Sequence, residues 1–308
     1  MSKRLRVPAT SANLGPGFDV FGMSLSLYNI LEFEERPRGS VRIEVSGEGV
    51  DDVPRIPEYN LAYRGFSRYF ESKNKKPPGV RLHLYNEVPV TRGLGSSATA
   101  IVSGIYAAAL IDGRDLPREE LFRLAVQIEG HPDNVAPAVF GGFVVSGKYG
   151  EGDAQRLHHL RFLPPAELRC VVAVPAFMLS TGVARRVLPA QVGFVDAAAN
   201  VRNAALLLAA MATGDLRQLE AIWPDAIEDQ LHQPHRLPLI KGGASAVQAA
   251  KQAGAFAVAI SGSGPSLIAF TTKSALAVGD AMRRTFAQHG VSTRILQLNP
   301  ETQGVHLL

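Results

Sequence analysis

A glycine-rich segment places backbone flexibility and two hydroxyls where a helix is expected to begin. It reads Val90-Thr91-Arg92-Gly93-Leu94-Gly95-Ser96-Ser97-Ala98. Glycines let a backbone approach a phosphate closely, and a helix N-terminus offers N–H groups and a favourable dipole to an anion. Either serine hydroxyl could also bind Mg²⁺. The segment lacks the lysine of a Walker loop and does not match the G-x-G-x-x-G fingerprint, so a serine-capped turn is the alternative to a phosphate site.

A second segment, residues 129–137, collects groups that packing does not require. It reads E-G-H-P-D-N-V-A-P and sets an acid, an imidazole, a second acid and an amide within six residues. Zinc is one interpretation, but His131 and Asp133 lack a partner at recognisable zinc-ligand spacing. Glu129 offers the hard oxygen that Mg²⁺ prefers, so the segment favours a magnesium-dependent site.

A third segment, residues 8–19, reads P-A-T-S-A-N-L-G-P-G-F-D. Small residues and glycines suit a loop around a compact ligand, to which Asn13 and Asp19 would present an amide and a carboxylate. The alternative is a turn in which both side chains bond their own backbone.

Three weaker signals lie in the second half of the chain. Arg185 and Arg236 have the default interpretation of solvated surface arginines. The segment Ser261-Gly262-Ser263-Gly264-Pro265 separates two apolar runs and has the composition of a hairpin turn. None of the three indicates a site without further context.

The pattern around the glycine-rich segment predicts the elements that carry it. Residues 80–88 alternate apolar and polar side chains, which is the period of a half-buried strand. A helix capped by Ser96 or Ser97 should follow, through about residue 111. A second helix should run from near Pro117 to Glu129, so that Glu129 and His131 lie at its end.

The second half of the chain has a different pattern. Strands are predicted at 169–175, 256–261, 266–271 and 291–298, and helical segments within 194–229 and at 241–253 and 275–288. This β-α-β-β-α-β order is ferredoxin-like. Because 308 residues exceed the usual size of one core, we expect two domains, at 1–155 and 156–308.

Composition limits the classes of partner. The net charge is +4, but the basic residues are scattered apart from Lys73, Lys75 and Lys76, which suits a small anionic ligand such as a nucleotide better than nucleic acid. Cys170 is the only cysteine, which favours the reducing cytoplasm. The apolar stretches at 98–111 and 204–212 are too short to span a bilayer, so we expect no membrane partner.

Together the three segments resemble the signature motifs of the GHMP kinases, in family order. Those at 8–19 and 129–137 resemble the homoserine kinase subgroup, whereas mevalonate kinases carry a P-S-G-x-D pattern at the corresponding place. The resemblance implies an α+β, two-domain GHMP kinase fold: an N-terminal domain like ribosomal protein S5 domain 2, with a left-handed crossover, and a ferredoxin-like C-terminal domain. It also implies ATP- and Mg²⁺-dependent phosphorylation of the L-homoserine side-chain hydroxyl to O-phospho-L-homoserine, in threonine biosynthesis.

The resemblance assigns roles to individual residues. The expected ATP-binding residues are Asn60, Pro89, Arg92, Gly93, Leu94, Gly95, Ser96, Ser97, Ala98 and Thr181. Ser97 and Glu129 are the expected Mg²⁺ ligands, although the sequence does not decide between Ser96 and Ser97. The expected substrate-binding residues are Asn13, Asp19, His131, Asp133, Asn134, Arg185 and Arg236, of which Asn13, Asp19, Asn134 and Arg185 would act in catalysis.

The expected chemistry needs no strong base. Mevalonate kinase relatives place an aspartate beside the acceptor hydroxyl, whereas Asn134 occupies that region here, and an amide accepts no proton at neutral pH. Asp19 would at most polarise the hydroxyl. Two alternatives stay open, namely a GHMP kinase acting on another small alcohol and a non-catalytic member that senses a ligand. A homodimer is compatible with the resemblance.

Overall fold

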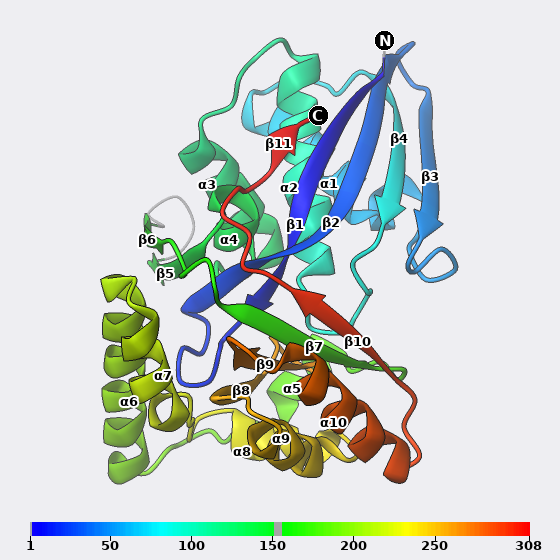
Figure 1. Cartoon of the computed structure of the whole chain (residues 1–308). Helices are drawn as coiled ribbons and strands as arrows, with labels where there is room; N and C mark the ends of the chain where they lie inside the picture. Colours follow the sequence, from blue (N-terminus) through cyan, green and yellow to red (C-terminus); the bar gives the residue numbers. More distant parts are fainter. Residues whose placement is uncertain (1, 151–155) are drawn as a thin grey trace.

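Two β-sheets organise the chain, the larger built mainly from its first half and the smaller from its second half (Figure 1). The computed structural model describes residues 2–150 and 156–308. The larger sheet has the order β11-β1-β2-β4-β3, with β5 paired to β2 and β6 paired to β5. Its strands are β1 (Lys3–Ala12), β2 (Phe21–Arg36), β3 (Val41–Gly47), β4 (Gly79–Asn86), β5 (Phe143–Tyr149), β6 (Arg156–Phe162) and β11 (His306–Leu307).

Helices cover one face of the larger sheet. They are α1 (Leu61–Ser72), α2 (Ser96–Ile111), α3 (Arg118–Glu129) and α4 (Val135–Phe140), and a short η1 (Pro57–Tyr59) precedes α1. The helix α2 is apolar on all sides because it packs between the sheet and the helices α1 and α3. The predicted strand, glycine loop and two helices are therefore confirmed.

The smaller sheet is antiparallel and has the order β10-β7-β9-β8. Its strands are β7 (Arg169–Pro175), β8 (Ala257–Ile260), β9 (Leu267–Thr271) and β10 (Thr293–Leu298). With α9 (Gly243–Gln252) and α10 (Ala275–Gln288) it has the predicted ferredoxin-like order. Between β7 and α9 the chain adds α5 (Thr181–Arg186), α6 (Phe194–Thr213), α7 (Leu216–Ala226), α8 (Gln233–Arg236) and η3 (Leu237–Leu239).

Two local expectations were wrong. Residues 8–12 are not part of a loop but the last residues of β1, and because all five are buried they show no alternation of apolar and polar side chains. Ser96 and Ser97 do not cap α2, because the N-cap is Gly95, in the left-handed conformation with no side-chain cap. Both serines lie in the first turn of the helix instead.

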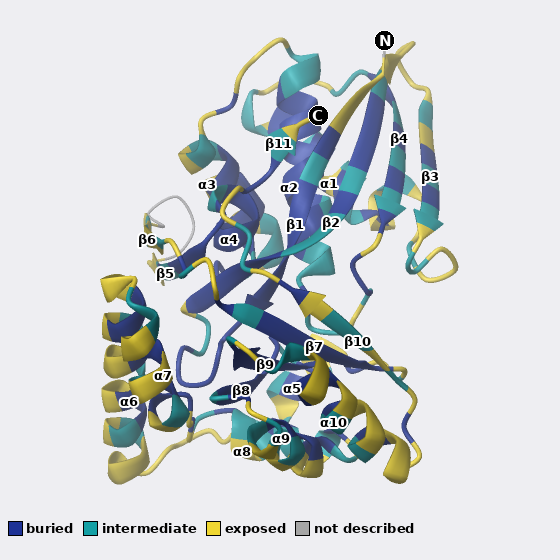
Figure 2. Cartoon of the chain, viewed as in Figure 1, coloured by how far each residue is buried: buried dark blue, intermediate teal, exposed yellow. Residues whose placement is uncertain are grey.

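The two halves share a hydrophobic core. One cluster joins Ala9 and Met23 of the larger sheet to Cys170 and Phe270 of the smaller one, and Figure 2 shows buried strands running through the junction. The strand β6 follows the predicted domain boundary yet pairs with β5, and β11 returns to β1. The boundary between residues 155 and 156 stays a prediction.

One helix passes a test for membrane-spanning segments. Within residues 2–150 and 156–308, α6 alone is long and apolar enough to cross a bilayer by length and composition. A single helix of this kind is weak evidence, because core helices of soluble proteins pass the same test. The helix packs against α7.

Candidate active site

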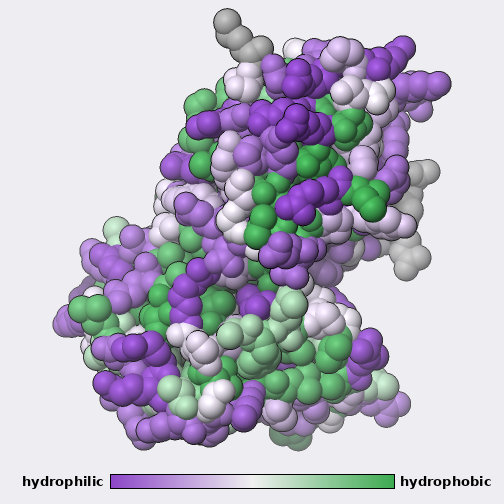
Figure 3. Space-filling model, turned by 90° about the vertical axis from the view of Figure 1, so that its right-hand side faces the viewer, coloured by the Kyte–Doolittle hydropathy of each residue, from purple (hydrophilic) through white to green (hydrophobic). Residues whose placement is uncertain are grey.

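A cavity of about 470 Å³ lies where the two halves of the chain meet. In the space-filling view the outline of the molecule has an upper and a lower lobe, with an indentation between them on the right (Figure 3). The cavity brings together the three polar segments and the two arginines, which are far apart in the sequence. Its lining includes Asn13, Asp19, Asn60, Arg92, Gly93, Leu94, Gly95, Ser96, Ser97, Glu129, His131, Asp133, Asn134, Thr181, Arg185 and Arg236.

The glycine loop is held from both sheets. Thr10 N donates to Leu94 O at 3.1 Å, and Ser261 Oγ donates to Gly93 O at 2.6 Å. Gly93 has φ +75°, and a Cβ there would lie 2.1 Å from Ser261 O. No side chain caps the first turn of α2, so its N–H groups are available to an anion in the cavity.

Glu129 and Ser97 form a pair of oxygen ligands beside this loop. Ser97 Oγ donates to Glu129 Oε1 at 2.5 Å, and burial raises the pKa of the Glu129 carboxyl. Among the described residues no group of three or more His, Cys, Asp or Glu could hold a metal. One carboxylate and one hydroxyl fit a Mg²⁺ ion whose remaining ligands are nucleotide phosphates and water.

The segment after α3 is braced internally. His131 Nδ1 lies 2.9 Å from Asp133 Oδ1, and this hydrogen bond raises the pKa of His131. Asp133 also accepts from Asn134 N at 3.0 Å. Asn134 Oδ1 accepts from Thr10 Oγ1 at 2.8 Å, which ties the segment to the end of β1.

The loop after β1 combines both interpretations made from its sequence. Asn13 Oδ1 accepts from Asp19 N at 3.0 Å, as in a self-bonded turn, and Asn13 Nδ2 donates to Gly262 O at 2.7 Å. The Asp19 carboxylate nevertheless points away from its own backbone and binds Arg185 through two hydrogen bonds of 2.7 and 3.1 Å. Such bidentate pairs are strong and geometrically specific.

The surface interpretation of Arg236 was wrong. Arg236 is 1% exposed, and its guanidinium donates from Nε to Ala184 O at 3.1 Å and from Nη1 to Gly262 O at 3.3 Å. A buried guanidinium needs such acceptors. Phe18 lies under both arginines, with its ring centroid 5.5 Å from Arg185 Cζ and 5.1 Å from Arg236 Cζ.

Two expected ATP-binding residues do not line the cavity. Pro89 lines a neighbouring surface hollow, and Ala98 is fully buried in α2. Conversely, Asp52, Tyr59 and Ser263 line the cavity although no sequence signal marked them as site residues. Ser263 was recognisable only as part of a glycine-rich turn, and Asp52 and Tyr59 lie in an otherwise unremarkable stretch.

Comparison with known proteins identifies the family. Residues 60–142 match the family described as GHMP kinases N terminal domain, and residues 207–288 match GHMP kinases C terminal. A homoserine kinase of Moorella thermoacetica is 47% identical over 300 residues, covering 97% of this chain and 98% of its own. The chain belongs to the homoserine kinase family. A Carboxydothermus hydrogenoformans homoserine kinase is 45% identical, covering 97% of this chain and 94% of its own.

Solved structures agree with membership of the homoserine kinase family. A homoserine kinase from Cytophaga hutchinsonii is 29% identical, has a TM-score of 0.88 and covers all of this chain and 97% of its own. A mevalonate kinase of L. major, 16% identical with a TM-score of 0.69, covers 97% of this chain and 96% of its own and shares the fold alone. As a GHMP kinase, the protein uses ATP as its co-substrate.

Proposed function

We propose that the protein is a homoserine kinase that uses ATP and Mg²⁺ to phosphorylate the side-chain hydroxyl of L-homoserine. The observation that carries this proposal is the composition of one cavity. It joins an uncapped helix N-terminus and a serine–glutamate pair to two arginines and an aspartate. The first set suits a metal-bound triphosphate, and the second suits a zwitterionic amino acid.

The nucleotide end is assigned to the glycine loop. The phosphates of ATP would accept hydrogen bonds from the first-turn N–H groups of α2, and Ser97 and Glu129 would hold Mg²⁺. The metal, when bound, neutralises phosphate charge and orients the γ-phosphoryl group. Asn60, whose side chain caps α1 by accepting from Tyr63 N, would lie near the adenine, and Thr181 near the γ-phosphate.

The acceptor end is assigned to the arginines and to the loop after β1. Arg185 and Arg236 would bind the α-carboxylate, because the cavity presents both guanidinium groups. Asn13, Asp19, His131, Asp133 and Asn134 would surround the rest of the substrate. The existing pair between Asp19 and Arg185 holds these two side chains in place before the substrate arrives.

In the reaction the bond between the γ-phosphorus and the β,γ-bridging oxygen breaks as the homoserine hydroxyl oxygen binds the phosphorus. ADP leaves, and the hydroxyl proton passes to an oxygen of the transferred phosphoryl group or to water. Phosphoryl transfer through a loose transition state depends on positioning and charge neutralisation. The amide of Asn134 accepts no proton at neutral pH. Asp19 would only polarise the acceptor hydroxyl. The reaction would therefore run without a strong side-chain base.

ADP release tests this assignment directly. The measurement uses Mg²⁺-ATP with L-homoserine, L-serine, L-threonine or mevalonate as acceptor. We expect turnover with L-homoserine to exceed that with the others by at least about a hundredfold in kcat/KM. Preferred turnover of mevalonate or another alcohol would instead indicate a different GHMP kinase. ATP binding without turnover of any acceptor would indicate a sensor.

A further inference from the structure

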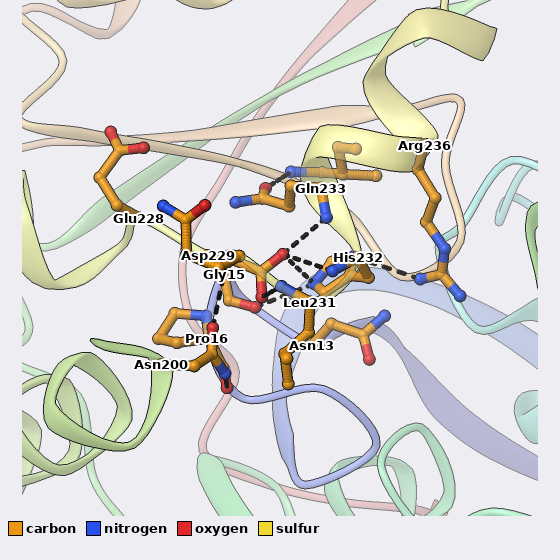
Figure 4. Close-up of polar contacts among 12 residues, drawn as sticks. Asn13, Gly15, Pro16, Asn200, Glu228, Asp229, Leu231, His232, Gln233 and Arg236 are labelled. Atoms are coloured by element: carbon orange, nitrogen blue, oxygen red, sulfur yellow. Dashed lines mark hydrogen bonds and ion pairs between the residues drawn. The ribbon is translucent and has the colours of Figure 1, made fainter. Parts of the chain in front are cut away.

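His232 is a buried imidazole for which the proposed reaction has no use. It lies just before α8, the helix that carries Arg236, and neither its side chain nor that of Asp229 has any exposed surface. Figure 4 shows it beside Asp229 and directed between Gly15 and Arg236. Gly15 belongs to the loop that also carries Asn13 and Asp19, so His232 lies between the two acceptor-binding elements.

Asp229 fixes the backbone on which His232 and Arg236 stand. Its Oδ1 accepts from Leu231 N at 3.0 Å, and its Oδ2 accepts from His232 N at 2.9 Å and from Gln233 N at 2.6 Å (Figure 4). Gln233 is the first residue of α8, and Leu231 and His232 precede it, so this carboxylate holds the turn that leads into the helix. The start of α8, and therefore the origin of the Arg236 side chain, is set by this one buried group.

The contacts of His232 define its protonation state. Nε2 lies 2.9 Å from Gly15 O, and because a carbonyl oxygen only accepts, Nε2 carries the proton. Nδ1 lies 3.4 Å from Arg236 Nη1, and because a guanidinium only donates, Nδ1 presents its lone pair. A neutral imidazole satisfies both neighbours, whereas a protonated imidazole would direct an N–H at the guanidinium.

We propose that neutral His232, held by Asp229, is a positioning residue that couples the loop after β1 to Arg236 and so sets the geometry of the acceptor site. The proposal rests on the proposed function, in which Arg236 binds the substrate carboxylate. Its mechanism is a chain of contacts from Gly15 O through the imidazole to the guanidinium. Loss of this chain leaves the guanidinium of Arg236 held only by its hydrogen bonds to Ala184 O and Gly262 O, while the nucleotide end stays intact.

The charges around His232 give the arrangement a pH dependence. Burial lowers the pKa of His232 below its usual 6.5, with Arg236 acting in the same direction and Asp229 and Asp19 opposing it. The centroid of the uncharged Phe18 ring lies 5.3 Å from the centroid of the His232 ring. The imidazole is therefore neutral at pH 7 and becomes charged only below pH 6.5. Acidification should then weaken acceptor binding as the imidazolium repels Arg236.

Two substitutions at this position separate positioning from packing. His232→Leu fills the space but offers neither donor nor acceptor, and we expect it to raise KM for L-homoserine about tenfold to a hundredfold. KM for ATP should stay within about twofold, because the glycine loop is not involved. His232→Gln supplies a neutral donor and acceptor that cannot be protonated, and should restore most of the lost affinity.

The pH profile supplies a readout that a purely structural role would not change. In the wild type, kcat/KM for L-homoserine should fall on an acidic limb below pH 6.5, and His232→Gln should lack this limb. If the Leu variant does not fold, the Gln profile decides alone.

Trp223→Phe is the control for lost stability, because it removes a buried hydrogen bond to Leu207 O elsewhere in the same half of the chain. It should leave both KM values unchanged. The proposal is overturned if His232→Leu raises the two KM values equally, or if the acidic limb persists in His232→Gln. Failure of the wild type to phosphorylate L-homoserine at all would instead overturn the proposed function.

Discussion

If Glu129 binds Mg²⁺ as proposed, folding and metal binding place opposite requirements on its carboxylate. Its carboxylate is partly buried at the end of α3, where it lines the cavity, and desolvation raises its pKa. A group whose folded-state pKa lies above its unfolded value of 4.5 binds more protons when folded, so the stability it contributes is lost as pH rises through the folded pKa. Above that pH the metal-free protein carries the cost of a partly desolvated negative charge.

Glu129→Gln should therefore stabilise the metal-free protein while impairing the enzyme. At pH 7 we expect Tm in the presence of a chelator to rise by about 2–4 °C, and kcat with Mg²⁺-ATP to fall at least about a hundredfold. Thermal unfolding between pH 4 and pH 8 checks the sign, because the difference in Tm should shrink toward pH 4. Glu119→Gln, at an exposed carboxylate of the same helix, should change neither quantity. A lower Tm for Glu129→Gln at pH 7 would contradict this account.

The sequence indicated some of these side chains and concealed others. Glu129 and His131 were recognisable because several reactive groups gather within six residues. Arg236 and His232 stand among residues typical of a surface turn, and only the fold shows that they are buried. Whether a polar side chain is buried depends on contacts distant in the sequence, which a local pattern does not contain.

At the scale of elements, the glycine loop and the β8–β9 hairpin pack so closely that a larger side chain at Gly93 would not fit between them. Gly93 lies against Ser261 O, and the positive φ at Gly93 favours glycine in any case. The hairpin is in turn bound to the end of β1, since Gly262 N donates to Ala12 O at 3.0 Å. A shift of the loop would therefore disturb both halves of the cavity.

Gly93→Ala should displace the loop, because its Cβ would collide with a backbone carbonyl. We expect KM for ATP to rise about tenfold or more and the free energy of unfolding to fall by about 1–3 kcal/mol. Steady-state kinetics and denaturant titration measure the two effects. Gly113→Ala is a matched control, because Gly113 has φ +72° with nothing within 4 Å of the added Cβ. Equal effects of the two substitutions on KM would show that backbone strain, rather than the collision, matters.

Elements with one exposed face were predicted better than buried ones. The strand at 79–86 and the helix at 118–129 alternate or repeat in their burial, so their periods were visible. The strands β1 and β2 are buried on both faces over much of their length, which removes the alternation that marks a strand. The residue pattern therefore did not predict that residues 8–12 belong to a strand.

At the scale of the whole molecule, the hydrophobic core shared by the two sheets should make unfolding cooperative. Domains joined by a polar linker move and unfold separately, whereas a large apolar contact couples them. Here Met23 and Phe143 of the larger sheet pack in one cluster with Cys170 and Phe270 of the smaller one. The cavity lies at this junction, so its shape depends on both halves being folded.

Met23→Ala should lower the stability of the whole chain in a single step. The side chain is fully buried, and its loss should cost about 2–5 kcal/mol. Calorimetry should show one transition, moved to lower temperature, in which both sheets melt together. Met178→Ala, at a side chain that is 55% exposed, should leave the transition nearly unchanged. Two separated transitions in either protein would contradict a common core.

The periodicity of apolar residues could not predict how the two halves of the chain are arranged. The chain length indicated two domains, and the second half showed its strand order, but the pairing of β11 with β1 joins residues about 300 apart. The resemblance to the GHMP kinases supplied the two-domain arrangement that the residue pattern lacked. The hand of the crossover through α1 stays a prediction.

The central proposal is that the protein phosphorylates the side-chain hydroxyl of an amino acid in this cavity, and that Arg236 binds the α-carboxylate of that amino acid. The most direct test compares kcat/KM for L-homoserine and for 3-aminopropan-1-ol, which lacks the carboxylate, in the wild type and in Arg236→Ala. We predict that the wild type prefers L-homoserine by about a thousandfold or more, and that the variant loses at least about tenfold of this preference. An unchanged preference in the variant, or none in the wild type, would contradict the account.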